Sequence, residues 1–148
     1  EMVFVQLGIL KIAASLEQQN YSVDMIDLSG VENYIDVLND YISTPTRASV
    51  FGITATTPQV PYAVKIGQFL KNKMPGDVSK VILGGPHVTL MHTAAKREAA
   101  KNFVGSNRAH KDVECLKQYF DVLVCGDGEL AIFDAITTNE KVIDADKE

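Results

Sequence analysis

The sequence predicts an α/β fold, a doubly wound parallel β-sheet with helices on both faces, and three observations carry this prediction. Short apolar runs rich in β-branched residues alternate with segments whose apolar residues recur every three to four positions. Glycine or proline bounds several of the runs. The length of 148 residues suits one domain. Runs that are apolar at nearly every position are typical of strands buried on both faces, which favours a parallel sheet.

Four runs are predicted as strands, at residues 22–28, 49–54, 80–84 and 121–125. A sheet of this kind normally opens with a strand before its first helix. Met2–Val5 are apolar but run into Gln6 and Leu7 without a loop. We therefore expect the first strand to lie before residue 1, or residues 2–5 to be a poorly formed remnant of it.

Helices are predicted between these strands, over residues 9–16, 31–42, 58–70 and 129–136. Thr57 is predicted as an N-cap with Pro58 at the first helical position. Pro75 and Gly76 are predicted to stop that helix. The alternation of strands and helices gives the doubly wound order.

Composition excludes several classes of protein. Apolar residues make up 46% and charged residues 22%, as in a folded globular domain. The net charge of −5 argues against nucleic acid as a partner. No apolar run reaches the roughly 18 residues of a membrane span, and no signal peptide is visible, so we expect a cytoplasmic protein with no membrane partner. Two cysteines are too few for a four-cysteine metal site.

Small and polar residues follow three of the predicted strands, where a parallel sheet binds its ligands. Each segment alone is ordinary turn chemistry, but all three are expected at one edge of the sheet, where glycine permits close approach and threonine offers hydrogen bonds. The candidate cofactor-binding residues are Thr54, Ala55, Thr56 and Thr57, then Gly84, Gly85, Pro86 and His87, then Gly126, Asp127, Gly128 and Glu129. The last segment also matches the first two glycines of a dinucleotide loop, but lacks the third.

Four ordered segments resemble the cobalamin-binding domains that precede radical SAM cores. This family includes anaerobic methyltransferases and the oxygen-independent magnesium-protoporphyrin ester cyclase. The resemblance is carried by Leu7–Leu10 with Tyr21–Asp27, by Phe51–Thr57, by Val81–Thr89, which is similar to the family's VVLGGPHAT, and by Phe120–Glu129, which is similar to FDYVVRGEGE. It implies a Rossmann-like or flavodoxin-like three-layer sandwich that holds cobalamin, possibly as a methyl carrier, at the carboxyl edge of the sheet.

Departures from the family pattern limit what the resemblance implies. A Cx3Cx2C cluster needs three cysteines, so S-adenosylmethionine and a [4Fe-4S] cluster would belong to a C-terminal radical SAM domain of the same polypeptide, absent from this chain. We accordingly expect no catalytic residue and no metal ligand here. The Asp-x-His-x-x-Gly motif that supplies an axial histidine is also absent, so cobalamin would bind without a histidine from this chain. The alternative is a degenerate domain of the same fold that acts as a substrate-recognition or interaction module.

Two further features are interpreted from the residues alone. His87 is lone and follows Gly-Gly-Pro, which favours a hydrogen bond to a neighbouring loop over a metal-binding role. Residues 92–111 exceed what one crossover needs, and we expect an exposed helical insertion near the carboxyl edge. This stretch is either a solvated face or a docking surface for the missing domain or an anionic group; its basic residues are Lys96, Arg97, Lys101, Arg108 and Lys111.

Overall fold

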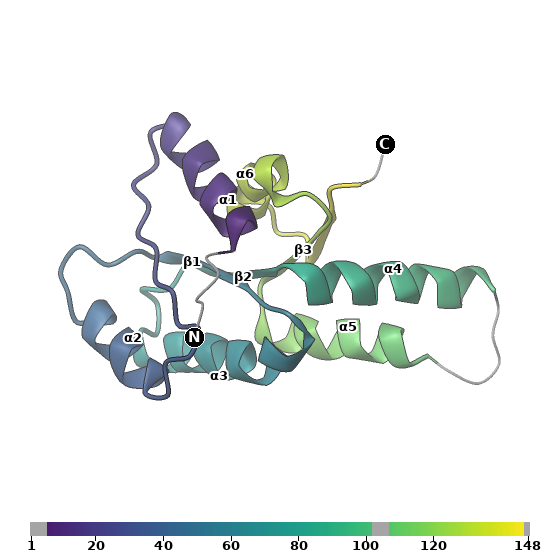
Figure 1. The fold of residues 1–148 in the computed structure, drawn as a ribbon, viewed down its shortest axis with the longest axis horizontal. Helices are drawn as coiled ribbons and strands as arrows, with labels where there is room; N and C mark the ends of the chain where they lie inside the picture. The colour runs from purple at the N-terminus through teal and green to yellow at the C-terminus, as the bar shows by residue number, and fades with distance from the viewer. Residues whose placement is uncertain (1–5, 102–106, 147–148) are drawn as a thin grey trace.

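The computed structural model of the chain describes residues 6–101 and 107–146. It contains one parallel sheet in the order β1-β2-β3-β4, so the predicted α/β class is confirmed (Figure 1). The strands are β1 (Val50–Thr54), β2 (Lys80–Gly84), β3 (Val122–Cys125) and β4 (Val142–Asp144). Thr54 pairs with Gly84, and Cys125 with Asp144, so the strands end at one common edge.

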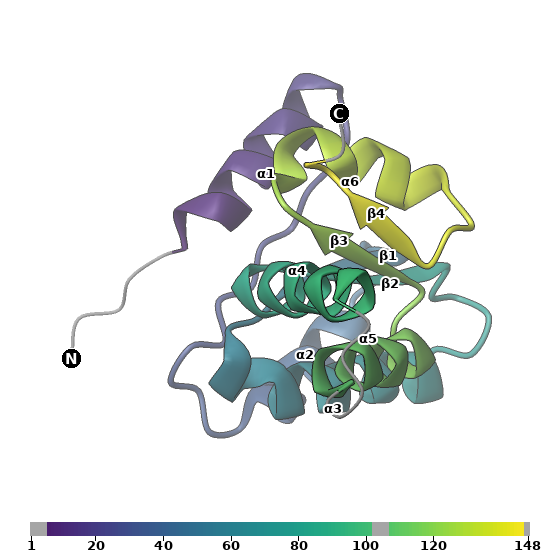
Figure 2. The same cartoon turned by 90° about the vertical axis from the view of Figure 1, so that its right-hand side faces the viewer.

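Helices cover both faces of the sheet and make three layers (Figure 2). One face carries α1 (Leu7–Gln18) and α6 (Gly128–Thr137). The other face carries α3 (Val60–Lys73), which follows the short 3-10 helix η1 (Thr57–Gln59), together with α4 (Pro86–Ala100) and α5 (Arg108–Tyr119). The remaining helix, α2 (Tyr34–Ile42), packs through Ile42 against Leu70 of α3.

The core lies on the two faces of the central strands β2 and β3. Val81 and Leu83 point toward α3, α4 and α5, whereas Ile82 and Val124 point toward α1 and α6. Successive side chains of a strand face opposite ways, so a strand covered on both faces must be apolar at every position. This is the physical reason for the continuous apolar runs in the sequence.

Residues 22–28 do not form the predicted strand. The segment has no regular secondary structure and belongs to no ladder, and Tyr21 and Met25 beside and within it are 44% and 48% exposed. Alternating apolar residues favour an extended backbone, but a strand also needs a neighbouring edge for its hydrogen bonds. In the described residues no strand lies beside this segment, and β1 is the edge of the sheet. Residues 2–5, considered above as a remnant strand, lie outside the described residues.

The fourth strand, β4, was not predicted. It has only three residues, which is too short for a periodicity to show.

The connection from β3 through α6 to β4 differs in handedness from the connection from β1 through α3 to β2. Both connections move in the same direction across the sheet, but α6 and α3 cover opposite faces. Parallel connections are nearly always right-handed, so one of the two departs from the rule.

The helical turn that follows β1 has its N-cap one residue earlier than predicted. Thr56, not Thr57, precedes the helical turn, and its backbone N–H donates to the Gln59 side chain at 2.9 Å. Pro58 lies inside η1, where its missing N–H costs nothing.

The described parts of the basic stretch 92–111 lie in the second half of α4, at the start of α5 and in the residues next to these helices. Figures 1 and 2 show α4 and α5 side by side, reaching out beyond the sheet. Lys96, Arg97 and Lys101 are exposed, and residues 102–106 lie outside the described residues. Throughout residues 6–101 and 107–146, no helix combines the length and apolar character needed to span a lipid bilayer.

Candidate cofactor-binding edge of the sheet

The loops after β1 and β2 interlock through their backbones. Ala55 N–H donates to the Gly84 carbonyl, and His87 N–H donates to the Ala55 carbonyl, each at 3.3 Å. Ala55 is only 1% exposed, so these bonds are shielded from water. The two loops are therefore joined by backbone hydrogen bonds at the carboxyl edge.

Gly85 makes this contact between the loops possible. Its φ of +100° is in the left-handed region that residues with a side chain rarely adopt. A Cβ at this position would lie 2.5 Å from Thr54 Oγ1 and 2.9 Å from the Ala55 nitrogen. Glycine at this position thus serves the packing of loop on loop.

His87 points into the protein and contacts the neighbouring loop. Its Nδ1 lies 3.1 Å from Thr57 Oγ1, and the residue is 8% exposed. Burial lowers the pKa of His87, and the carboxylate of Asp112 acts weakly in the opposite direction. The imidazole is therefore neutral at pH 7, and its Nδ1 is occupied by the threonine hydroxyl.

The loop after β3 is joined to the other two through one threonine. Thr89 Oγ1 accepts from Gly126 N–H at 3.0 Å and donates to the Gly85 carbonyl at 3.2 Å. Gly126 has a φ of +82°, and a Cβ there would lie 2.5 Å from the carboxylate of Asp146. All three predicted segments are thus parts of one connected surface.

The start of α6 is fixed by Asp127, Gly128 and Glu129. The Asp127 carboxylate accepts from Glu129 N–H at 3.2 Å, which caps the helix. The Glu129 carboxylate pairs with Lys11 at 2.9 Å. A Cβ on Gly128 would lie 2.9 Å from Ile12 Cδ1, so the glycine lets α1 and α6 pack closely.

The remaining predicted residues have space or solvent beside them. Thr57 and Pro86 are exposed, and Asp127 is exposed despite its capping role. A Cβ on Gly84 would make only ordinary contact, 3.7 Å from the Val124 carbonyl. Thr54 Oγ1 donates to the Gln6 side chain at 3.4 Å, which places the start of α1 at this same edge.

Cys125 ends β3 close to this surface, but its thiol is unreactive. Its thiol is 2% exposed, and burial, aided by the nearby Asp144 carboxylate, raises its pKa to about 12. A thiol with that pKa carries almost no thiolate at pH 7, so it is a poor nucleophile and a poor metal ligand.

A polar cluster at the end of β4 was missed because β4 itself was missed. The Asp144 carboxylate binds the Lys96 ammonium and lies 3.1 Å from His92 Nε2. Its side chain is 6% exposed. The sequence signal that could have indicated the cluster was Asp144 directly after the β-branched residues Val142 and Ile143. The cluster ties the α4–α5 hairpin to the edge strand.

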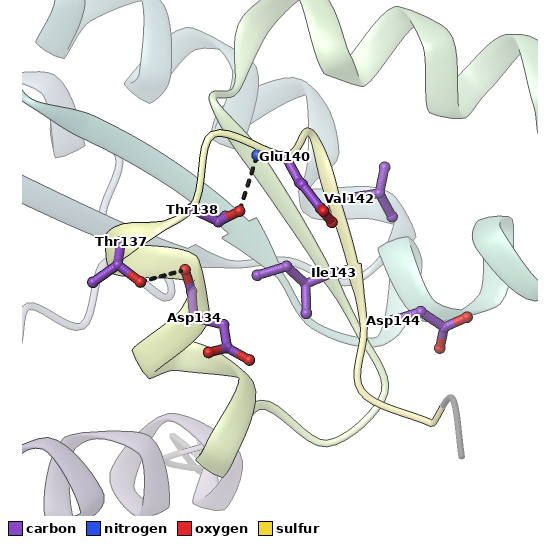
Figure 3. A pocket seen from close by; sticks show the side chains of 7 residues that line it. All are labelled: Asp134, Thr137, Thr138, Glu140, Val142, Ile143 and Asp144. Atoms are coloured by element: carbon purple, nitrogen blue, oxygen red, sulfur yellow. Dashed lines mark hydrogen bonds between the residues drawn. The ribbon is translucent and has the colours of Figure 1, made fainter.

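A pocket of about 420 Å³ lies between the end of α6 and β4 (Figure 3). None of the predicted site residues lines it; its walls are Asp134, Thr137, Thr138, Glu140, Val142, Ile143 and Asp144. Within the described residues, no group of three or more histidine, cysteine or carboxylate side chains is arranged to hold a metal ion.

The parallel sheet, the helices on both faces and the joined loops at its carboxyl edge define a Rossmann-like domain. Residues 1–109 match the B12 binding domain family, and the chain belongs to that family. The matched residues include the first two loops of the edge and end before the third, at residues 126–129.

One solved structure has a similar fold. It is the N-terminal domain of the hypothetical protein TM0182 from Thermotoga maritima, with a TM-score of 0.50 and 16% sequence identity. The similarity covers 98% of this chain and 99% of that chain, and at this identity it concerns the fold alone. No curated protein matches the sequence.

Proposed function

We propose that this chain holds a corrinoid cofactor across the three loops at the carboxyl edge of the sheet and supplies no ligand to the cobalt. The observation that carries the proposal is the physical joining of the loops through Ala55, Gly85 and Thr89 into one surface. A preorganised surface of this kind binds a large ligand without first ordering its own loops.

The side chains at this edge suit the chemistry of a corrinoid. A corrinoid is a flat macrocycle with amide side chains around its rim, so it needs hydrogen-bond partners at the rim and apolar contacts beneath the ring. Thr57 and Asp127 are exposed and polar, and Pro86 is exposed and apolar. His87 is only 8% exposed, which supports a cobalt without a protein imidazole.

The chain would act together with a second domain. The resemblance to domains that precede radical SAM cores supports a C-terminal partner domain in the same polypeptide, which would hold S-adenosylmethionine and a [4Fe-4S] cluster. When bound, the corrinoid supplies cobalt-centred methyl transfer, and this chain positions it. Catalysis would then lie in the partner domain, in a cytoplasmic enzyme.

A second candidate is a domain of the same fold that binds no corrinoid and recognises a substrate or partner. The contacts of three glycines favour it. The Cβ directions of Gly85, Gly126 and Gly128 point at protein atoms, so these glycines are explained by packing within the domain. The absence of Asp-x-His-x-x-Gly also favours it.

Retention of hydroxocobalamin by the purified chain separates the two candidates. After mixing and desalting, the first candidate predicts a coloured protein with close to one corrinoid per chain, read from its visible absorbance. A colourless protein would leave the interaction module as the function.

Electron paramagnetic resonance of the Co(II) form tests the absence of a protein ligand. Protein labelled with ¹⁵N and unlabelled protein should give the same nitrogen hyperfine pattern, and His87→Ala should not alter it. A splitting that follows the protein label, or that disappears in His87→Ala, would contradict the histidine-free site.

A further inference from the structure

The strand β4, at one end of the sheet, directs part of its backbone away from the other strands. On its inner side, the Lys141 carbonyl accepts a hydrogen bond from β3 and the Ala145 N–H donates one to β3, each at 2.9 Å. Backbone groups alternate in direction along a strand, so the N–H and carbonyl groups of Val142 and Asp144 face the outer side. In the part of the chain that the structure describes, no strand pairs with β4 on that side. The outer edge of β4 can therefore pair with a further extended backbone.

Side chains on both faces of β4 hold the strand in place. On one face, the Asp144 carboxylate binds the Lys96 ammonium and lies 3.1 Å from His92 Nε2, and both partners belong to α4. On the other face, Ile143 packs with the buried residues of α6. An added strand would therefore meet an edge that is already ordered, which lowers the entropic cost of binding.

The pocket of about 420 Å³ lies beside this edge and has acidic walls (Figure 3). Asp134 and Glu140 line it and are exposed. Within residues 6–101 and 107–146, neither of these two carboxylates has an ion-pair or hydrogen-bond partner. Val142 and Ile143 give the pocket an apolar wall. Two carboxylates and an apolar surface thus lie next to the open backbone edge.

Two lysines close to the pocket are bound to backbone carbonyls instead of these carboxylates. The Lys80 ammonium donates to the Ile136 and Thr138 carbonyls at the end of α6. The Lys141 ammonium donates to the Phe120 carbonyl at 3.3 Å. The pocket therefore presents negative charge that a basic side chain would complement.

We propose that the outer edge of β4 and this pocket together bind an extended, basic segment of a partner protein, which adds a strand to the sheet. The proposal is independent of the cofactor site, because none of the residues of the three loops lines the pocket. Backbone hydrogen bonds to Val142 and Asp144 supply affinity, and side chains at alternate positions of the added strand enter the pocket. A lysine or arginine there lays its carbon chain on Ile143 and brings its charged group to Asp134 or Glu140.

A second copy of this chain does not suit this edge. Two β4 strands paired across a twofold axis would bring the two pockets together, because such an interface uses the same surface of both copies. Asp134 and Glu140 of one copy would then approach the same carboxylates of the other, and like charges placed together oppose association. A basic strand from a different protein meets no such repulsion.

Binding of short blocked peptides, measured by fluorescence anisotropy, tests the proposal. One peptide alternates valine with lysine, a second carries glutamate in place of lysine, and a third is the lysine peptide with methylated backbone nitrogens. We expect the lysine peptide to bind about tenfold more tightly than either of the others, because glutamate reverses the charge and methylation removes the hydrogen-bond donors. The bound lysine peptide should also slow amide hydrogen exchange at Val142 and Asp144.

Two double variants that remove the same charge provide a matched comparison. Asp134→Asn with Glu140→Gln removes the pocket carboxylates, and Asp36→Asn with Asp40→Asn removes two exposed carboxylates of α2. We expect the pocket variant to bind the lysine peptide about tenfold more weakly, and the α2 variant to stay within about twofold of the wild type. Thermal unfolding checks that both variants are folded as the wild type is.

Three results would overturn the proposal. The first is no binding of the lysine peptide by the wild type, or equal weakening by the two double variants. The second is binding without slower exchange at Val142 and Asp144, because the peptide would then be held by charge alone. The third is a wild-type dimer in sedimentation experiments that the pocket variant strengthens, which would assign the edge to a second copy. None of these results involves a corrinoid, so each leaves the proposed function intact.

Discussion

Residues 6–48 and the remainder of the described chain, 49–101 and 107–146, are held in the molecule in different ways. In the first region α1 has no buried residue, and Leu38 and Ile42 of α2 are its only buried apolar residues. In the second region the central strands β2 and β3 are covered on both faces. The first region rests on the outside of a core that the second region builds.

The difference shows what a sheet adds to a local pattern. Residues 22–28 and residues 80–84 both carry apolar residues in a sequence suited to an extended backbone. The second segment has strands to pair with and becomes β2, whereas the first pairs with no strand among the described residues. Backbone extension is local, whereas the ladder depends on segments far away in sequence.

The largest expected loss of stability comes from a substitution at the centre of the second region. Phe120 is fully buried, and its ring packs against Gly67 of α3, where a Cβ would lie 3.1 Å away. Phe120→Ala should lower the free energy of unfolding by about 3–5 kcal/mol, because it leaves a cavity in a packed core. Chemical denaturation measures this. A loss below about 1 kcal/mol would mean that this core is no tighter than the packing of residues 6–48.

A second, smaller effect concerns two glycines, Gly52 in β1 and Gly85 in the loop after β2. Gly85→Ala should cost about 1–3 kcal/mol, because of the left-handed φ and the contact with Thr54. Gly52→Ala, in the edge strand, meets nothing within 4 Å and should change stability by less than about 0.5 kcal/mol.

The same contacts limit how the site can be tested. A bulky side chain at Gly85 or Gly126 would disturb Thr54 or Asp146 before it could block a ligand. Equal thermal stability of Gly85→Ala and Gly52→Ala would contradict this account and make Gly85 a purely steric probe.

A third prediction uses the acid sensitivity of β4. The hydrogen bond from Lys96, with one from His92, lowers the pKa of Asp144 below its usual value, although burial opposes this. A lowered pKa in the folded state contributes stability that is present above the ordinary pKa of about 3.9 and lost as the pH falls through the lower, folded value. Asp144→Asn should therefore cost about 1–2 kcal/mol near neutral pH and progressively less below about pH 4.

The control for this prediction lies in the first region. The Asp27 pKa is also lowered, by the N–H of Ser29 at 2.9 Å, but Asp27 is exposed and forms only a local turn. Asp27→Asn should give a smaller loss with the same pH direction. Unfolding curves of both variants between pH 2 and pH 7 test this prediction. A loss of stability in Asp144→Asn that stays constant over this range would show that the ionised Asp144 carboxylate is not the source of the stabilisation.

The sequence predicted most of the sheet and the place of the candidate site, for reasons visible in particular residues. Val81–Leu83 and Val122–Cys125 are apolar at every position because both faces are buried. The residues after β1, β2 and β3 could be placed at one edge because parallel strands share their direction. How the loops touch was not predictable, since Thr89 and Gly126 are far apart in sequence and meet only through the register of β2 and β3.

The smallest effect is expected at Met25, and it sharpens the contrast between the regions most directly. Met25 lies in the segment that has an apolar pattern but no ladder, and it is 48% exposed. Because its side chain already contacts water, Met25→Ala removes little buried surface and should change the free energy of unfolding by less than about 0.5 kcal/mol. Leu83→Ala, at a fully buried position of β2, is the matched variant and should cost about 2–5 kcal/mol. Urea denaturation of both variants gives the comparison. A loss at Met25 approaching that at Leu83 would mean that residues 22–28 pack against a partner in solution, and that the region outside the sheet is held as firmly as the region within it.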